Sequence, residues 1–136
     1  MFPRYIGMMN GLLKCFIIGD ITEFGLPFYS DSIIYKMCAE HSGILTLGSL
    51  GGAYAKCGDA IMGFLPYKCE VEKGDFEIEL VLTRRNTFGP LHQNEENITV
   101  CEPSSFVTTG DKFTEDYRLI RQGILESPVI RYSYTK

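Results

Sequence analysis

The stretch Asp75-Phe76-Glu77-Ile78-Glu79-Leu80 decides the fold, because it alternates strictly between charged and apolar side chains. Successive side chains of a β-strand point to opposite faces of its sheet, so Phe76, Ile78 and Leu80 share one face. The three acids share the other face. This pattern is typical of a half-buried strand, with one face on the core and one face in solvent.

Short apolar runs recur on both sides of this stretch and are separated by turn residues, among them 14 Gly and 6 Pro. No run of ten residues keeps the i, i+3, i+4 apolar spacing of an amphipathic helix. We expect turns at residues 40–43, 48–52 and 58–59 and a long loop at 102–115. We expect further strands at residues 32–39, 43–47, 53–57, 60–64, 97–101, 117–120 and 129–134.

Short strands joined by glycine turns predict an all-β fold, an antiparallel β-sandwich or barrel. Residues 32–39 carry apolar side chains on both faces, which favours a central strand. The chain has 136 residues, the size of one domain. We therefore expect residues 1–136 to form a single β-sandwich domain.

The charge of the chain argues against nucleic acid as a partner. The chain has 13 Lys and Arg and 17 Asp and Glu, which gives a net charge of -4. Binding to the phosphates of a nucleic acid needs basic side chains gathered on one face of the protein. The one tight basic pair is Arg84-Arg85.

Apolar runs are also too short for a membrane span, and the run in residues 1–18 is interrupted by Gly11 and Lys14. We expect no membrane partner.

Five cysteines (Cys15, Cys38, Cys57, Cys69 and Cys101) form an odd set without CxxC spacing. This pattern predicts free thiols in a reducing, cytoplasmic compartment rather than a disulfide framework. With two histidines and no HxxxH or CxxC spacing, the sequence also predicts neither a metal site nor a cofactor.

No catalytic arrangement stands out, so we expect no enzymatic activity. The acids of the 75–80 stretch are typical of a solvated sheet face rather than a pair of catalytic carboxyl groups. There is no G-x-S-x-G motif and no cysteine with an evident histidine partner. His41 lies at 40–43, which we predict to be a hairpin turn, and we expect it to be exposed there.

The segment Arg84-Arg85-Asn86-Thr87-Phe88-Gly89-Pro90-Leu91-His92 concentrates polar and aromatic groups. Arg and Asn donate directional hydrogen bonds that suit sugar hydroxyls, and an aromatic face can pack on a sugar ring. The alternative is that these groups bind backbone carbonyls and hold an irregular loop in place. The candidate carbohydrate-binding residues are Arg84, Arg85, Asn86 and His92, with Tyr67 as a candidate stacking face.

Residues 27–31 (PFYSD), the segment 84–92 and the residues between them resemble a pattern in C-terminal domains of large glycoside-hydrolase-like proteins. The resemblance spans about residues 20–125, and it implies a galactose-binding-like jelly roll akin to the sugar-binding domain of glycoside hydrolase family 2. Such domains often brace a separate catalytic barrel. The chain lacks Trp and has Cys57-Gly58 where the family turn often reads Asn-Gly, which weakens the case for direct sugar binding.

A catalytic (β/α)8 barrel takes about 250 residues, so any glycosidase site of a parent protein would lie outside this chain. The resulting hypothesis is a non-catalytic, carbohydrate-binding-like accessory domain of a glycoside-hydrolase-like protein. Its rival is an interaction module that docks a catalytic domain or a second copy of itself, without sugar binding. That rival predicts an exposed apolar patch, which we place on residues 1–18.

Overall fold

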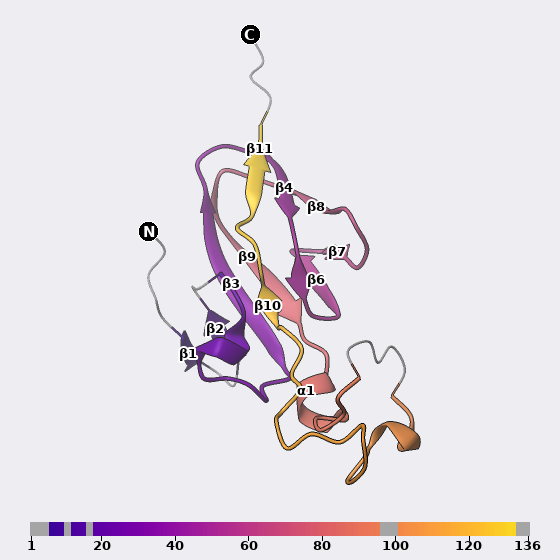
Figure 1. The fold of residues 1–136 in the computed structure, drawn as a ribbon. Coiled ribbons are helices and arrows are strands. Elements are labelled where there is room, and N and C mark those ends of the chain that lie inside the picture. The colour runs from indigo at the N-terminus through magenta and orange to yellow at the C-terminus, as the bar shows by residue number, and fades with distance from the viewer. Residues whose placement is uncertain (1–5, 10–11, 16–17, 96–100, 133–136) are drawn as a thin grey trace.

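The computed structural model describes residues 18–95 and 101–132, together with the backbone of residues 6–9 and 12–15. The larger of its sheets has six strands (Figure 1). Neighbouring strands in this sheet are antiparallel except β2 and β3, which run parallel. Their spatial order is β1 (Ile6–Met9), β2 (Leu12–Cys15), β3 (Ser32–Ala39), β9 (Gly74–Val81), β6 (Tyr54–Cys57) and β7 (Ala60–Met62).

A second layer is formed by two smaller antiparallel sheets. The order β11-β4-β8 makes up the three-stranded sheet, and β10 pairs with β5 beside it. Because β4 is followed by β5 and β10 by β11, the short β10-β5 pair continues the line of the β11-β4 pair. The strands are β4 (Gly43–Leu47), β5 (Leu50–Gly51), β8 (Tyr67–Val71), β10 (Gly123–Ile124) and β11 (Val129–Arg131).

Strand β9 follows the alternation of its sequence. Ile78 and Leu80 are fully buried, whereas Glu77 lies on the opposite, solvent-facing side. There its carboxylate is 3.5 Å from the ammonium group of Lys36 on the neighbouring strand β3. The predicted half-buried strand is confirmed, and β3 is central in its sheet as its apolar composition predicted.

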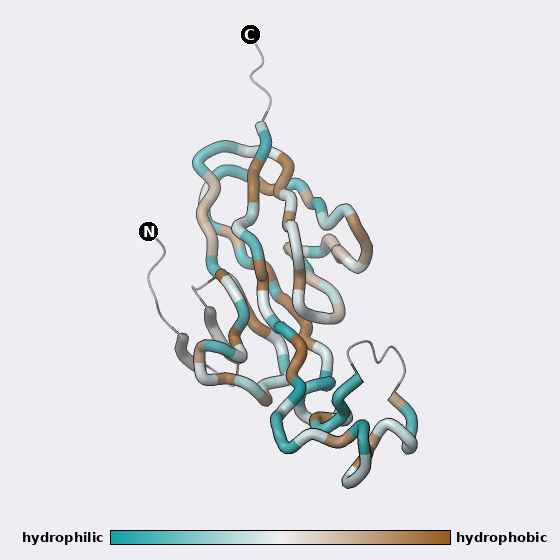
Figure 2. The backbone as a smooth tube through the Cα atoms, in the orientation of Figure 1, coloured by the Kyte–Doolittle hydropathy of each residue, from teal (hydrophilic) through white to brown (hydrophobic). Residues whose placement is uncertain are grey.

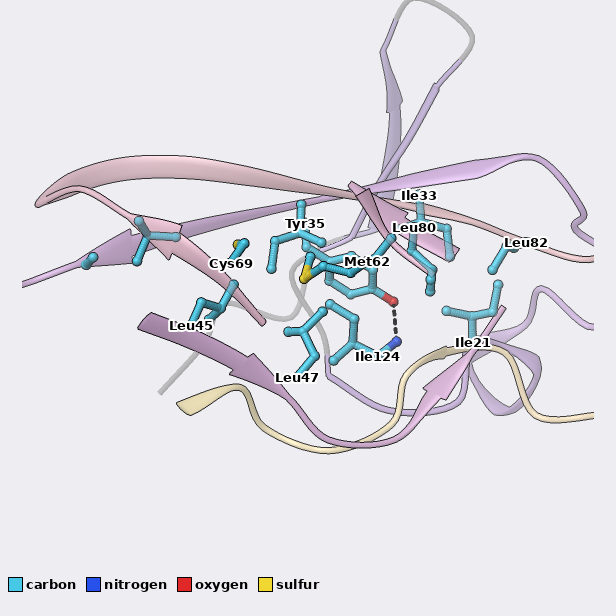
Figure 3. Packing of buried hydrophobic residues seen from close by; sticks show 14 residues of the cluster. Ile21, Ile33, Tyr35, Leu45, Leu47, Met62, Cys69, Leu80, Leu82 and Ile124 are labelled. Atoms are coloured by element: carbon cyan, nitrogen blue, oxygen red, sulfur yellow. Dashed lines mark hydrogen bonds between the residues drawn. The ribbon is translucent and has the colours of Figure 1, made fainter. Parts of the chain in front are cut away.

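The core lies between the two layers (Figure 3). Ile33 and Tyr35 project from β3, and they meet side chains of the smaller sheets. The Tyr35 hydroxyl accepts a hydrogen bond from the Ile124 backbone N–H, 3.0 Å away, which links the layers through a buried polar contact. The members of the core from the smaller sheets are Leu45, Leu47, Cys69, Val71 and Ile124.

The described residues are therefore all-β and sandwich-like, with little helix. The helical pieces are η1 (Ile21–Phe24), α1 (Arg85–Phe88) and η2 (Pro103–Ser105). None of the helices in the described part of the chain is long and apolar enough to cross a membrane.

Several predicted elements are confirmed. The strands expected at 32–39 and 43–47 match β3 and β4, and the turn at 58–59 joins β6 to β7. The loop at 102–115 is irregular apart from η2 and an isolated bridge at Phe113. The expected strand at 97–101 falls largely outside the described residues, as do the side chains of residues 1–17, where an apolar patch was predicted.

Three predictions were wrong. Residues 117–120 form no strand. The turn at 40–43 does not close a hairpin, because β3 and β4 belong to different sheets and the chain crosses between the layers there. The glycine stretch 48–52 is not only a turn, since it contains β5. At Gly51 a Cβ atom would stand 2.3 Å from the Arg121 carbonyl oxygen, so glycine allows the two chains to approach closely.

Candidate functional site

After β9 the chain leaves the sheets and forms what we call the loop lobe, residues 83–95 and 101–122, at the lower end of the molecule in Figure 1. Its two arms, residues 83–95 and residues 101–122, are joined by backbone hydrogen bonds. The Thr114 N–H donates to the His92 carbonyl (2.9 Å), and the Arg118 N–H donates to the Leu91 carbonyl (2.7 Å). These bonds fix which residues of the second arm lie beside the segment 84–92.

Asn86, the second residue of α1, is fully buried. Its amide Nδ2 donates to the Ile120 carbonyl and its Oδ1 accepts from the Ile120 N–H, both at 2.8 Å. A side chain that satisfies both backbone groups of a distant residue acts as a clamp within the loop lobe. Asn86 therefore has the loop-holding role of the alternative interpretation, and its amide is not presented to a ligand.

The two arginines lie at the start of α1. Arg84 is exposed at the N-cap position, where its side chain makes no capping hydrogen bond. Arg85 is half-buried, and its Nη1 donates to the Cys101 sulfur 2.7 Å away. Arg84 thus presents its guanidinium group to solvent, whereas Arg85 uses part of its group to tie the two arms together.

His92 is half-buried between the arms of the loop lobe. Its Nδ1 is 3.0 Å from the Thr114 carbonyl oxygen. A carbonyl oxygen only accepts, so Nδ1 carries the proton in this hydrogen bond and Nε2 of the neutral ring is left as an acceptor. An acceptor at this position suits a hydroxyl group as a donor.

Aromatic rings surround His92. The ring centroids of Tyr117 and Phe113 lie 5.0 and 5.8 Å from that of the imidazole. Phe28, from the loop before β3, packs edge-on against Tyr117 at 5.2 Å. The Thr87 hydroxyl donates to the Phe28 carbonyl (2.7 Å), which ties that loop to the loop lobe. We call Phe28, His92, Phe113 and Tyr117 the aromatic surface.

The aromatic surface is open to solvent, since 42% of Phe28 and 58% of Tyr117 are exposed. In the sequence, Phe28 belongs only to the family pattern and Tyr117 to an expected strand, and Phe113 has no assigned role. The one local signal was the aromatic content of the long loop. Nothing in the sequence indicated that these rings meet at His92.

Beside His92 lies a hollow of about 250 Å³. Residues 89–92 form one side and residues 105–108 the other, and apolar groups of Leu91, Phe106 and Val107 line much of it. Ordinary small-molecule pockets measure roughly 300–1,000 Å³. This hollow is therefore sized for a small ligand or for one ring of a larger one.

Tyr67, the fifth candidate, is the first residue of β8 and pairs with Leu47 in the three-stranded sheet. Its ring is half-buried and packs against the core. The structure thus assembles Arg84, Arg85, Asn86 and His92 in the loop lobe and leaves Tyr67 in a sheet. Within residues 18–95 and 101–132, no group of three or more His, Cys, Asp or Glu side chains is arranged to hold a metal ion.

No protein-family model, curated protein or solved structure shows significant similarity to this chain. The proposed function therefore depends on the geometry of the loop lobe and on the resemblance in the sequence.

Proposed function

We propose that this chain is a non-catalytic, carbohydrate-binding-like accessory domain of a glycoside-hydrolase-like protein, with a galactose-binding-like jelly-roll fold. We place the sugar contact on the aromatic surface and on Arg84, which is exposed in the same loop lobe. The observation that carries this proposal is the exposed ring of Tyr117 beside His92 and Phe28. The all-β, sandwich-like architecture is compatible with such a domain.

The chemistry of the surface suits a neutral polyol. One face of a pyranose ring is apolar enough to pack on an aromatic side chain, while its hydroxyl groups need polar partners. The ring of Tyr117 would supply the packing face and Nε2 of His92 an acceptor. The exposed Arg84 would donate to hydroxyl oxygens. Asn86 would contribute indirectly, by holding Ile120 and so the arm that carries Tyr117.

The test is a titration of the 15N-labelled 136-residue protein with a panel of mono- and oligosaccharides, followed by NMR chemical shifts. We expect shifts at residues around His92 that saturate at millimolar sugar and disappear in Tyr117→Ala. Spectra that do not change up to millimolar sugar across the panel would dismiss the sugar-binding role.

Tyr132→Ala is a matched control. Tyr132 is also an exposed tyrosine next to a histidine, with its ring centroid 4.8 Å from that of His41. It follows β11, at the end of the molecule opposite α1 (Figure 1). Loss of binding in both variants would show that the shifts report general surface contact rather than a site.

A second candidate function, docking of a catalytic domain or of a second copy, is favoured by β7 and the chain that joins it to β8. Phe64 is 89% exposed, Leu65 75% and Ile61 70%, and the segment appears as a brown turn on the right of Figure 2. Contiguous exposed apolar side chains are typical of interaction sites, and β7 is an edge strand of its sheet. Sedimentation tests the self-association arm: a dimer that Phe64→Ser dissociates supports it, and a strict monomer rejects it.

A further inference from the structure

The aromatic surface and the hollow beside it have His92 in common. The imidazole lines the hollow, and its ring centroid lies 5.0 Å from that of Tyr117 on the aromatic surface. A ligand ring that packs on Tyr117 can therefore extend a substituent past His92 into the hollow. The shape of the site thus depends on what the hollow accepts.

The walls of the hollow are mainly apolar. They include one buried and two half-buried side chains and one exposed ring, namely Pro90, Leu91, Val107 and Phe106. A hydroxyl group that is buried without a hydrogen-bond partner is destabilising. At about 250 Å³, the hollow therefore suits a small substituent with an apolar end better than a second hydroxylated ring.

Polar groups also line the hollow. Nε2 of His92 is an acceptor, because Nδ1 donates to the Thr114 carbonyl. Ser105, the last residue of η2 at the lower right of Figure 1, is buried and belongs to the lining. Its hydroxyl oxygen accepts from the Glu102 N–H at 3.3 Å, which leaves the hydroxyl proton to donate elsewhere. The hollow thus offers an acceptor and a donor beside apolar walls.

We propose that the hollow is a subsite for the acetamido group of an N-acetylated amino sugar. This inference rests on the proposed sugar-binding function, and it names the class of sugar. An acetamido group combines an apolar methyl end with an N–H donor and a carbonyl acceptor. The methyl group packs against Leu91 and Val107. The N–H replaces a sugar hydroxyl as the donor to Nε2 of His92, and the carbonyl oxygen accepts from the Ser105 hydroxyl.

The test compares matched sugars by NMR titration of the 15N-labelled 136-residue protein. The pairs are glucose with N-acetylglucosamine and galactose with N-acetylgalactosamine. In at least one pair we expect the N-acetylated sugar to bind about tenfold more tightly, because it buries one more methyl group and makes one more hydrogen bond. It should also shift the amide signals of residues 105–108, which the unsubstituted sugar leaves unchanged.

Val107→Phe places a larger side chain at the wall of the hollow, and in this variant the ratio of the two Kd values should approach one. Val129→Phe is the matched control, because Val129 is 53% exposed but lies in β11, at the opposite end of the molecule (Figure 1). It should keep the tenfold ratio. Nuclear Overhauser contacts from the acetyl methyl group to Leu91 and Val107 in the unmodified protein test the same placement without a variant.

The outcomes separate this inference from the proposed function. If each unsubstituted sugar binds at the aromatic surface as tightly as its N-acetylated partner, the inference is overturned and the sugar-binding role stands. Methyl glucoside that binds as tightly as N-acetylglucosamine would also overturn it, since an O-methyl group brings no N–H donor. If none of these sugars binds, both the inference and the proposed function are rejected.

Discussion

Removal of the Asn86 side chain is the sharpest test of how the loop lobe is built. The amide is fully buried, and it makes two hydrogen bonds of 2.8 Å to the backbone of Ile120. In Asn86→Ala both backbone groups of Ile120 lose their partner, and a small void remains under α1. We expect a large loss of stability from a residue that lies outside all three sheets.

The magnitude follows from the two orphaned groups. Each buried backbone group left without a partner costs about 1–3 kcal/mol. Ile120 itself is 40% exposed, so water can reach part of its backbone and the cost lies in the lower half of that range. We expect the free energy of unfolding to fall by about 2–4 kcal/mol. For a domain of this size that lowers the Tm by about 10 °C.

Urea denaturation followed by circular dichroism measures the change, provided that the transition is two-state. Arg84→Ala is the matched control, because its side chain is two residues away and exposed at the N-cap of the same helix. It should change stability by less than about 0.5 kcal/mol. If Asn86→Ala were equally mild, the clamp between Asn86 and Ile120 would not hold the loop lobe, and our account of the site would fail.

Three further variants test the fold and its surface. Tyr35→Phe leaves the buried Ile124 N–H without its acceptor, and we expect a loss of about 1–3 kcal/mol in urea denaturation. Gly123→Ala places a Cβ 2.4 Å from the Gly19 carbonyl oxygen at a φ of 125°; a loss of at least about 3 kcal/mol is expected, measured as the urea midpoint. Phe64→Ser changes an 89% exposed side chain and should leave the Tm unchanged within about 2 °C by calorimetry.

The strands could be predicted where apolar and polar side chains alternate within one continuous stretch of the sequence. Strands β3 and β9 are each eight residues long, and the burial of Ile78 and Leu80 follows directly from the sequence pattern. Strand β8 was missed although Cys69 and Val71 alternate with exposed residues in it. Its alternation covers only five residues and follows Pro66 directly, so no strand was expected there.

The error at residues 117–120 has a different cause. The segment has strand-like side chains in the sequence, but its backbone pairs with no strand. The Arg118 N–H donates to the Leu91 carbonyl in a loop, and the Ile120 N–H donates to the side chain of Asn86. A strand and a loop with apolar side chains can have the same local sequence pattern. They differ in whether their backbone N–H and C=O groups bond to a neighbouring strand or to other groups. The partners of Arg118 and Ile120 lie 27 and 34 residues away in the chain, so no local pattern specifies them.

The aromatic surface is decided by the same long-range contacts. A nine-residue window around His92 contains its polar neighbours in the chain, but the rings that contact His92 come from the other arm of the loop lobe. The position of Tyr117 depends on backbone bonds such as that between Arg118 and Leu91, and on the clamp that Asn86 provides. A variant that loosens the clamp should therefore weaken ligand binding at the aromatic surface even when sheets and core remain folded. A binding defect in Asn86→Ala with unaltered β-sheet signal would accordingly identify the residue as a positioning residue, whereas a defect in Tyr117→Ala at unchanged stability would identify a direct contact.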